Sequence, residues 1–123
     1  MKKINSELPN FIIEKGEVDT NFELDGSEND KELLELSIEK WQTIVDHIKS
    51  HIGKSRMVKD GGKWTCTCCL RYFENHCYAC PIYEYKSRTH CEETPYALYQ
   101  DKPNLTNAKK EVAFLKKVLE SLE

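Results

Sequence analysis

The six cysteines of this 123-residue chain all lie within 26 consecutive residues, from Cys66 to Cys91. Thiols at this density either share a metal ion, pair as disulfides, or stay free in a core. The first residues include lysines but no apolar stretch typical of a signal peptide, and no apolar run approaches the roughly 18 residues of a membrane span. We therefore expect a cytoplasmic protein with no membrane partner, in which a metal site is favoured over disulfides.

Two C-x-x-C knuckles, Cys66/Cys69 and Cys77/Cys80, provide the expected metal ligands. Each knuckle lets two sulfurs converge on one ion, and four thiolates complete the tetrahedral shell of zinc. Seven residues separate the knuckles, fewer than in the common zinc ribbon, but in extended form they reach about 24 Å. A second quartet replaces Cys77 with Cys91. The sequence therefore predicts Cys66, Cys69 and Cys80 as ligands, with either Cys77 or Cys91 as the fourth.

The type of metal site follows from the donor set. Four thiolates leave no position for water, so we expect structural Zn²⁺ rather than a catalytic ion. Cys80-Pro81 is also found in bacterial ferredoxins, but their C-x2-C-x2-C-x3-C spacing is absent, which favours zinc over an iron–sulfur cluster. The triplet His90-Cys91-Glu92 is similar to that of zinc deaminases, but both knuckles lie before it, whereas those enzymes have one after it. No catalytic set is recognisable, and we predict that the protein is not an enzyme.

Residues 29–52 predict an amphipathic helix, because their apolar side chains recur at alternating steps of four and three. Ser27, Asn29 and Asp30 are candidate N-caps. His47 and His51 lie four residues apart on this helix and are interpreted as exposed helix surface rather than as metal ligands. The predicted apolar stripe consists of Leu34, Ile38, Trp41, Val45, Ile48 and Ile52.

A second amphipathic helix is predicted from about residue 107 to the end of the chain, after a break at Pro103-Asn104. Thr106 and Asn107 are its candidate caps. Because each apolar stripe needs a partner, we expect the two helices to pack on each other, with the Cys-rich segment crossing between them. The stripe of the second helix consists of Ala108, Val112, Leu115, Leu119 and Leu122.

The remaining elements are predicted to be short. Residues 1–28 form an acidic N-terminal arm or a short hairpin with strands at 11–13 and 22–24, and residues 57–65 form a tight hairpin that leads into Cys66. Short helical turns are expected to begin at Pro81 and Pro95. The fold class predicted is mainly α with a small β-hairpin. Residues 29–123 are predicted to form one domain containing the zinc-binding segment, at about residues 56–100.

Charge is unevenly distributed along the chain, with a net charge of −6 over residues 1–52, +4 over 53–91 and −1 over 92–123. Four thiolates with one divalent ion would reduce the positive excess of the middle segment. Eight of the twelve aromatic residues lie between residues 54 and 99, so this basic, aromatic segment is a candidate for stacking bases and binding phosphates. Aromatic residues and arginine equally favour a small core or a protein interface. We expect a protein partner, with nucleic-acid binding as the alternative.

The combined motifs resemble those of a group of small Cys-rich proteins encoded by bacteriophages and prophages, over about residues 33–122. The shared features are residues 36–41 (Leu-Ser-Ile-Glu-Lys-Trp), the two knuckles with Pro81-Ile82, Cys91 followed by Thr94-Pro95-Tyr96, and Phe114-Leu115 near the end. The recurring cysteines of the group match Cys66, Cys69, Cys77, Cys80 and Cys91, whereas Cys68 lies where an apolar residue is usual. The resemblance implies a zinc-stabilised phage accessory protein that binds a host or phage protein, and inhibition of a host defence system is an activity within that class.

Overall fold

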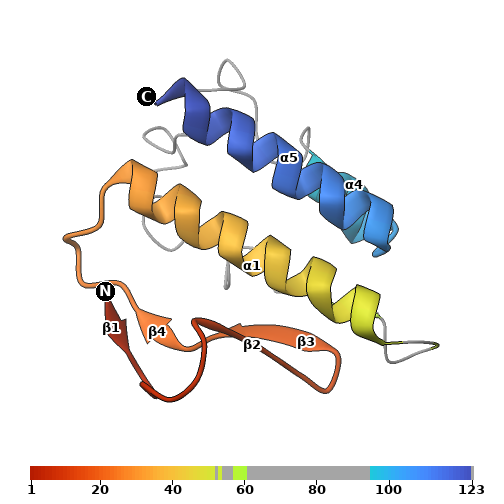
Figure 1. Cartoon of the computed structure of the whole chain (residues 1–123), viewed down its shortest axis with the longest axis horizontal. Coiled ribbons are helices and arrows are strands. Elements are labelled where there is room, and N and C mark those ends of the chain that lie inside the picture. Colours follow the sequence, from red (N-terminus) through yellow and green to blue (C-terminus); the bar gives the residue numbers. More distant parts are fainter. Residues whose placement is uncertain (52, 54–56, 61–94, 123) are drawn as a thin grey trace.

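The computed structural model describes residues 1–51, 53, 57–60 and 95–122. Within these residues the chain is mainly helical with two small sheets, which confirms the mainly α character of the predicted fold class. Helix α1 lies between the strands on one side and helices α4 and α5 on the other (Figure 1). None of the described helices combines the length and apolar character of a membrane span. The elements are β1 (Lys2–Lys3), β2 (Phe11–Glu14), β3 (Glu17–Thr20), β4 (Phe22–Glu23), α1 (Asp30–Ser50), α4 (Pro95–Asp101) and α5 (Leu105–Ser121).

Helix α1 begins with a capping box. Among the three candidate caps the structure selects Asn29, whose side chain accepts a 2.8 Å hydrogen bond from the Glu32 N–H, while the Glu32 carboxylate accepts from the Asn29 N–H. Within the predicted stripe, Ile38 is only half-buried and Ile52 lies outside the described residues, while the other four are buried. A second row is buried beside them, because α1 is covered on two sides. This row consists of Leu33, Ser37, Lys40 and Ile44.

Helices α1 and α5 run antiparallel and pack on each other as predicted (Figure 1). The predicted cap of α5 was wrong. Asn104 occupies that position, and its side chain accepts a 2.9 Å hydrogen bond from the Asn107 N–H. The side-chain amide of Asn107 donates hydrogen bonds to the Leu98 and Lys102 carbonyls and so joins α4 to α5. Leu122 was also wrong as a stripe residue, since it is exposed beyond the end of the helix, whereas Val118, outside the predicted stripe, is buried.

The cap of α5 gives a direct stability test. Asn104→Ala should lower the free energy of unfolding by about 1 kcal/mol, because an orphan N–H in the first helical turn loses its acceptor. Thr106→Ala is the matched control, since Thr106 is exposed and caps nothing in the structure, and its effect should stay within about 0.5 kcal/mol. Urea unfolding of both variants measures the difference. A larger loss for Thr106→Ala would contradict the assignment of the cap.

The N-terminal residues contain the predicted strands and turn, but the second strand of the hairpin differs from the prediction. Strand β2 pairs with β3 in antiparallel register, with Glu14 opposite Glu17. The two turn residues, Lys15 and Gly16, both have positive φ (52° and 76°), as a two-residue turn of type I′ requires. Phe22, predicted to belong to the hairpin, lies in β4 and pairs with β1. It still reaches the core, where its ring meets that of Phe11 edge-on at 5.3 Å.

Residues 57–60, the start of the second predicted hairpin, run beside β3. The Lys59 N–H donates to the Gly16 carbonyl at 2.7 Å, and the Lys59 carbonyl accepts from the Val18 N–H at 3.2 Å. Val58 is fully buried in the common core. The turn after Asp60 and the second predicted arm, residues 63–65, lie outside the described residues. The chain therefore enters the Cys-rich segment from a position fixed against the N-terminal hairpin.

Candidate metal-binding segment and its structural base

The predicted zinc ligands all fall within residues 61–94, outside the part of the chain that the structure describes. The same holds for the turn predicted at Pro81. Within the described residues, no group of three or more histidine, cysteine or acidic side chains is arranged to hold a metal. What the structure does describe is the chain on both sides of this segment: residues 57–60 before it and helix α4 after it. The predicted ligands are Cys66, Cys69, Cys77, Cys80 and Cys91.

The residues that flank the Cys-rich segment are hydrogen-bonded to each other. The Tyr99 hydroxyl donates a 2.6 Å hydrogen bond to the Val58 carbonyl, and both residues are buried. At the next residue of α4, the Gln100 side-chain amide donates to the Asp60 Oδ2 at 3.3 Å. Helix α4 begins at Pro95, as the sequence predicted, so it presents Tyr99 and Gln100 to the chain at 58–60. Residues 61–94 therefore begin and end at one place on the scaffold.

A buried ion pair fixes this place to helix α1. The Lys40 Nζ lies 2.8 Å from the Asp60 Oδ1, and their side chains are 1% and 0% exposed. The same ammonium lies 5.0 Å from the centre of the Trp41 ring, whose neighbour is the Tyr99 ring, edge-on at 4.8 Å. A buried charge that loses its counter-charge is strongly destabilising, so replacing either Lys40 or Asp60 alone should lower the free energy of unfolding. We call these five residues the base of the Cys-rich segment: Lys40, Trp41, Val58, Asp60 and Tyr99.

Sequence reasoning missed the ion pair of the base. Lys40 and Asp60 are charged residues 20 positions apart, and an isolated charge on a helix is ordinarily assigned to the solvent-exposed face. The available signal was the position of Lys40, three residues after Ser37 and four before Ile44, in the row that proved to be buried. Trp41 was correctly placed in the core, and Tyr99 was counted only as one of the aromatic residues of the basic segment.

Tyr99 gives a pH-dependent test of the base. Burial, together with the negative charge of Asp60, raises the pKa of the Tyr99 phenol well above its ordinary value of 10.0. The unfolded chain therefore releases this proton at a lower pH than the folded chain. The contribution to stability is complete below about pH 10 and decreases as the pH rises further.

Tyr99→Phe should cost about 1–3 kcal/mol of unfolding free energy at neutral pH, because it leaves the buried Val58 carbonyl without its donor. It should also reduce the decrease in stability above pH 10, since one fewer proton is then released on unfolding. Tyr96→Phe is the control, because Tyr96 is only half-buried at the edge of the same aromatic cluster. Equal alkaline profiles for wild type and Tyr99→Phe would contradict this account.

The histidine pair lies at the C-terminal end of α1, with His47 in the last turn and His51 at the C-cap. The His47 and His51 rings stack at 3.8 Å, and the His51 Nδ1 lies 2.8 Å from the His47 carbonyl oxygen. His51 is exposed and His47 half-buried. The His51 ring thus lies against the last turn of α1, where its Nδ1 contacts the His47 carbonyl oxygen.

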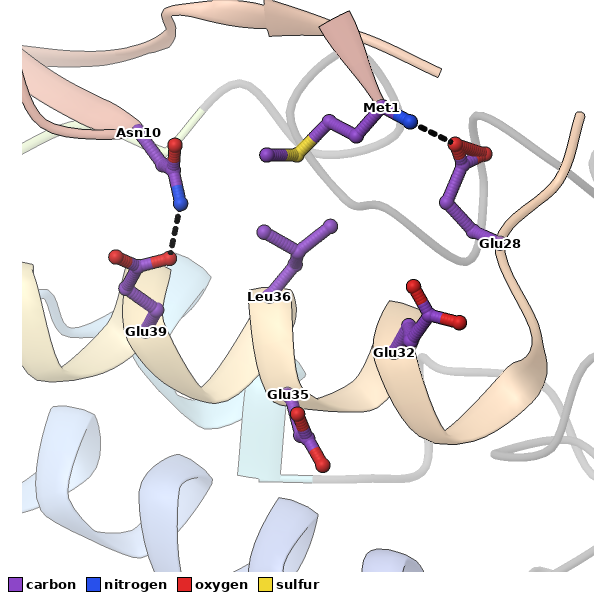
Figure 2. A pocket seen from close by; sticks show the side chains of 7 residues that line it. All are labelled: Met1, Asn10, Glu28, Glu32, Glu35, Leu36 and Glu39. Atoms are coloured by element: carbon purple, nitrogen blue, oxygen red, sulfur yellow. Dashed lines mark hydrogen bonds and ion pairs between the residues drawn. The ribbon is translucent and has the colours of Figure 1, made fainter. Parts of the chain in front are cut away.

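An acidic hollow of about 350 Å³ lies where the N-terminal residues meet the first half of α1 (Figure 2). The Leu36 side chain points from the helix toward the Met1 side chain, which gives the hollow an apolar part. At one end the Asn10 amide donates to the Glu39 carboxylate at 2.8 Å. The other residues that line the hollow are the acidic residues Glu28, Glu32 and Glu35.

Glu28 is the buried member of this hollow. Burial acts to raise the pKa of its carboxyl, but the Met1 ammonium at 2.8 Å and the N–H of Asp25 act against it, and the pKa is lowered overall. Glu32, Glu35 and Glu39 follow the three-and-four spacing of one face of α1, so the sequence contained a signal for an acidic stripe. The sequence contained no signal for the wall of the hollow that Met1 and Asn10 contribute from the N-terminal residues. The hollow adds to the acidic surface of the N-terminal half.

No protein-family model matches this chain, and no similar protein was found among curated sequences or solved structures.

Proposed function

We propose that this chain is a non-enzymatic, zinc-stabilised binding protein that acts on a protein partner in the host cytoplasm, of the kind encoded by phages and prophages. The observation that carries the proposal is the base of the Cys-rich segment. A buried ion pair fixes Asp60 to α1 and a buried hydrogen bond joins Tyr99 to Val58, so the chain before and the chain after the intervening 34 residues lie side by side on the helical scaffold. A segment of this length is short for a core of its own, and a metal ion would supply stability to it.

The donor chemistry fits zinc. This segment contains all six thiols of the chain, and its two C-x-x-C knuckles supply four thiolates, the ligand set of closed structural zinc sites. When bound, the ion would contribute to the free energy of folding, and its four thiolate ligands would leave no coordination position open to water or a substrate. Cys66, Cys69 and Cys80 would hold it together with Cys77 or Cys91. Cys68 is left out of both quartets.

A protein partner is favoured over nucleic acid by charge and by the use of two aromatic residues. The chain has a net charge of −3 and an acidic hollow over α1. Tyr96 and Tyr99, two of the aromatic residues available for base stacking, pack instead against Trp41. Within the class of phage accessory proteins, we propose that the partner belongs to a host defence system, and this step is supported by the sequence resemblance alone.

The proposal is tested by affinity capture from infected or lysogenic cells with the zinc-loaded chain as bait. We expect a specific protein to be retained, and to be lost when the bait is Cys80→Ser. Nuclease treatment of the lysate serves as the control. If retention depends on nucleic acid, or if purified chain binds an oligonucleotide with an affinity that falls steeply with salt, the basic segment 54–99 acts on nucleic acid and the proposal fails.

A further inference from the structure

A second groove lies between α1 and α5, away from the acidic hollow. Its volume is about 230 Å³, and its floor is apolar, formed by Val45, Val112 and Ala113. The two valines are buried between the helices, while Ala113 is exposed, so this part of the floor is accessible. The remaining lining residues form a polar rim: Gln42, Lys49, Lys109 and Lys116.

The rim has a regular spacing along the helices. Gln42 and Lys49 are seven residues apart on α1, and Lys109 and Lys116 are seven apart on α5, so each pair spans two turns, about 10 Å. Because the helices run antiparallel (Figure 1), Lys49 and Lys109 flank one end of the groove and Lys116 with Gln42 the other. All three ammonium groups are on exposed residues, and no carboxylate is among the residues that line the groove. Positive charge therefore stands at both ends of an apolar floor.

We infer that this groove receives an amphipathic helix of the protein partner, with two acidic side chains about two turns apart and a large apolar side chain between them. This rests on the proposed function, because it specifies the chemistry of the partner. The acidic side chains match the lysines at the two ends, and the apolar side chain covers Ala113. A closed cavity of about 150 Å³ accommodates benzene, so this groove has room for a side chain the size of leucine or phenylalanine. A third helix lying on two packed helices is a common way to extend a bundle.

The composition of the groove favours a peptide over nucleic acid. Its lining contains no aromatic ring on which a base could stack and no arginine to bind a phosphate with two donors. An apolar floor contributes nothing to phosphate binding, whereas it contributes directly to a helix that buries an apolar side chain. Charge complementarity at both ends then sets the position of that helix along the groove.

The test uses a defined probe with the full-length, zinc-loaded protein. The probe is a fluorescent, covalently stapled helical peptide with Glu, Leu and Glu at positions i, i+3 and i+7, and a matched peptide carries Lys in place of both Glu. Fluorescence anisotropy should show binding of the Glu peptide, with binding at least about tenfold weaker for the Lys peptide. Lys109→Glu/Lys116→Glu should weaken binding of the Glu peptide at least about tenfold, and Ala113→Gln, which fills the floor without a charge change, should also weaken it.

Lys31→Glu/Lys102→Glu is the matched control, since it makes the same change in net charge at exposed lysines outside the groove. It should change the affinity less than about twofold. Equal losses for the two double variants would overturn the inference, as would tighter binding of single-stranded DNA than of the Glu peptide at the groove. Concentration-dependent self-association that Ala113→Gln abolishes would identify a second copy as the occupant and would also overturn it. If the protein does not bind the Glu peptide but still captures a partner from cells, the groove assignment alone is overturned. If the wild-type protein contains no zinc or captures no partner, the proposed function is overturned.

Discussion

Cys80→Ser is expected to release the metal ion and unfold the Cys-rich segment, while Cys68→Ser is tolerated. Cys80 belongs to both candidate quartets, and Cys68 belongs to neither. A structural zinc ion contributes about 10 kcal/mol or more of apparent binding free energy to folding, so losing one of four ligands should lower the melting temperature by about 15 °C or more. Calorimetry and metal analysis of the two serine variants measure both effects.

Cys68→Ser is a matched control, because it makes the same chemical change two positions away from Cys66 and one from Cys69. Its zinc content should equal that of the wild type, and its melting temperature should change by only a few degrees. Equal melting temperatures for the two variants, or full zinc content in Cys80→Ser, would contradict the ligand assignment.

Asp60→Asn is expected to cost about 3–5 kcal/mol of unfolding free energy, the largest loss we predict within the described residues. The side chain keeps its size, but the Lys40 ammonium, 1% exposed, loses the carboxylate that lies 2.8 Å away. The exposed carboxylate Asp101 at the end of α4 provides the control, and Asp101→Asn should change stability by less than about 0.5 kcal/mol. Urea unfolding followed by tryptophan fluorescence reports on both, since Trp41 lies beside the pair.

Adding Lys40→Met to Asp60→Asn should recover part of this loss, because the buried ammonium that lost the Asp60 carboxylate is then removed as well. A double variant less stable than Asp60→Asn alone would show that the Lys40 ammonium does not depend on Asp60. A loss for Asp60→Asn no larger than that of Asp101→Asn would contradict the buried pair and, with it, the base of the Cys-rich segment.

The helices could be predicted from the sequence because their signals are local and redundant. In α1, the apolar period and the closely spaced candidate caps Ser27, Asn29 and Asp30 all indicate a helix start near residue 30. The cap of α5 was misassigned by two or three residues, because Asn104, Thr106 and Asn107 are all able to cap, and only the packing of α4 decides that Asn107 bonds backward to Leu98 and Lys102.

The tertiary features could not be predicted, because each depends on a contact between distant residues. The burial of Lys40 requires Asp60, and the acidic hollow requires Met1 and Asn10 to lie against α1. The second hairpin strand was misassigned because Val18 and Phe22 both reach the core, one from each small sheet. For the metal site, the sequence specifies donor chemistry through its thiols, but spacing alone leaves Cys77 and Cys91 as alternatives.

The most direct test of the account is native mass spectrometry of the purified chain combined with alkylation of its cysteines. We predict one zinc ion per chain, with two of the six cysteines alkylated before chelation and all six after it. A metal-free chain would contradict the account. Its cysteines would either be free, with all six alkylated before chelation, or oxidised, with the mass of the chain lower by about 2 Da for each disulfide formed.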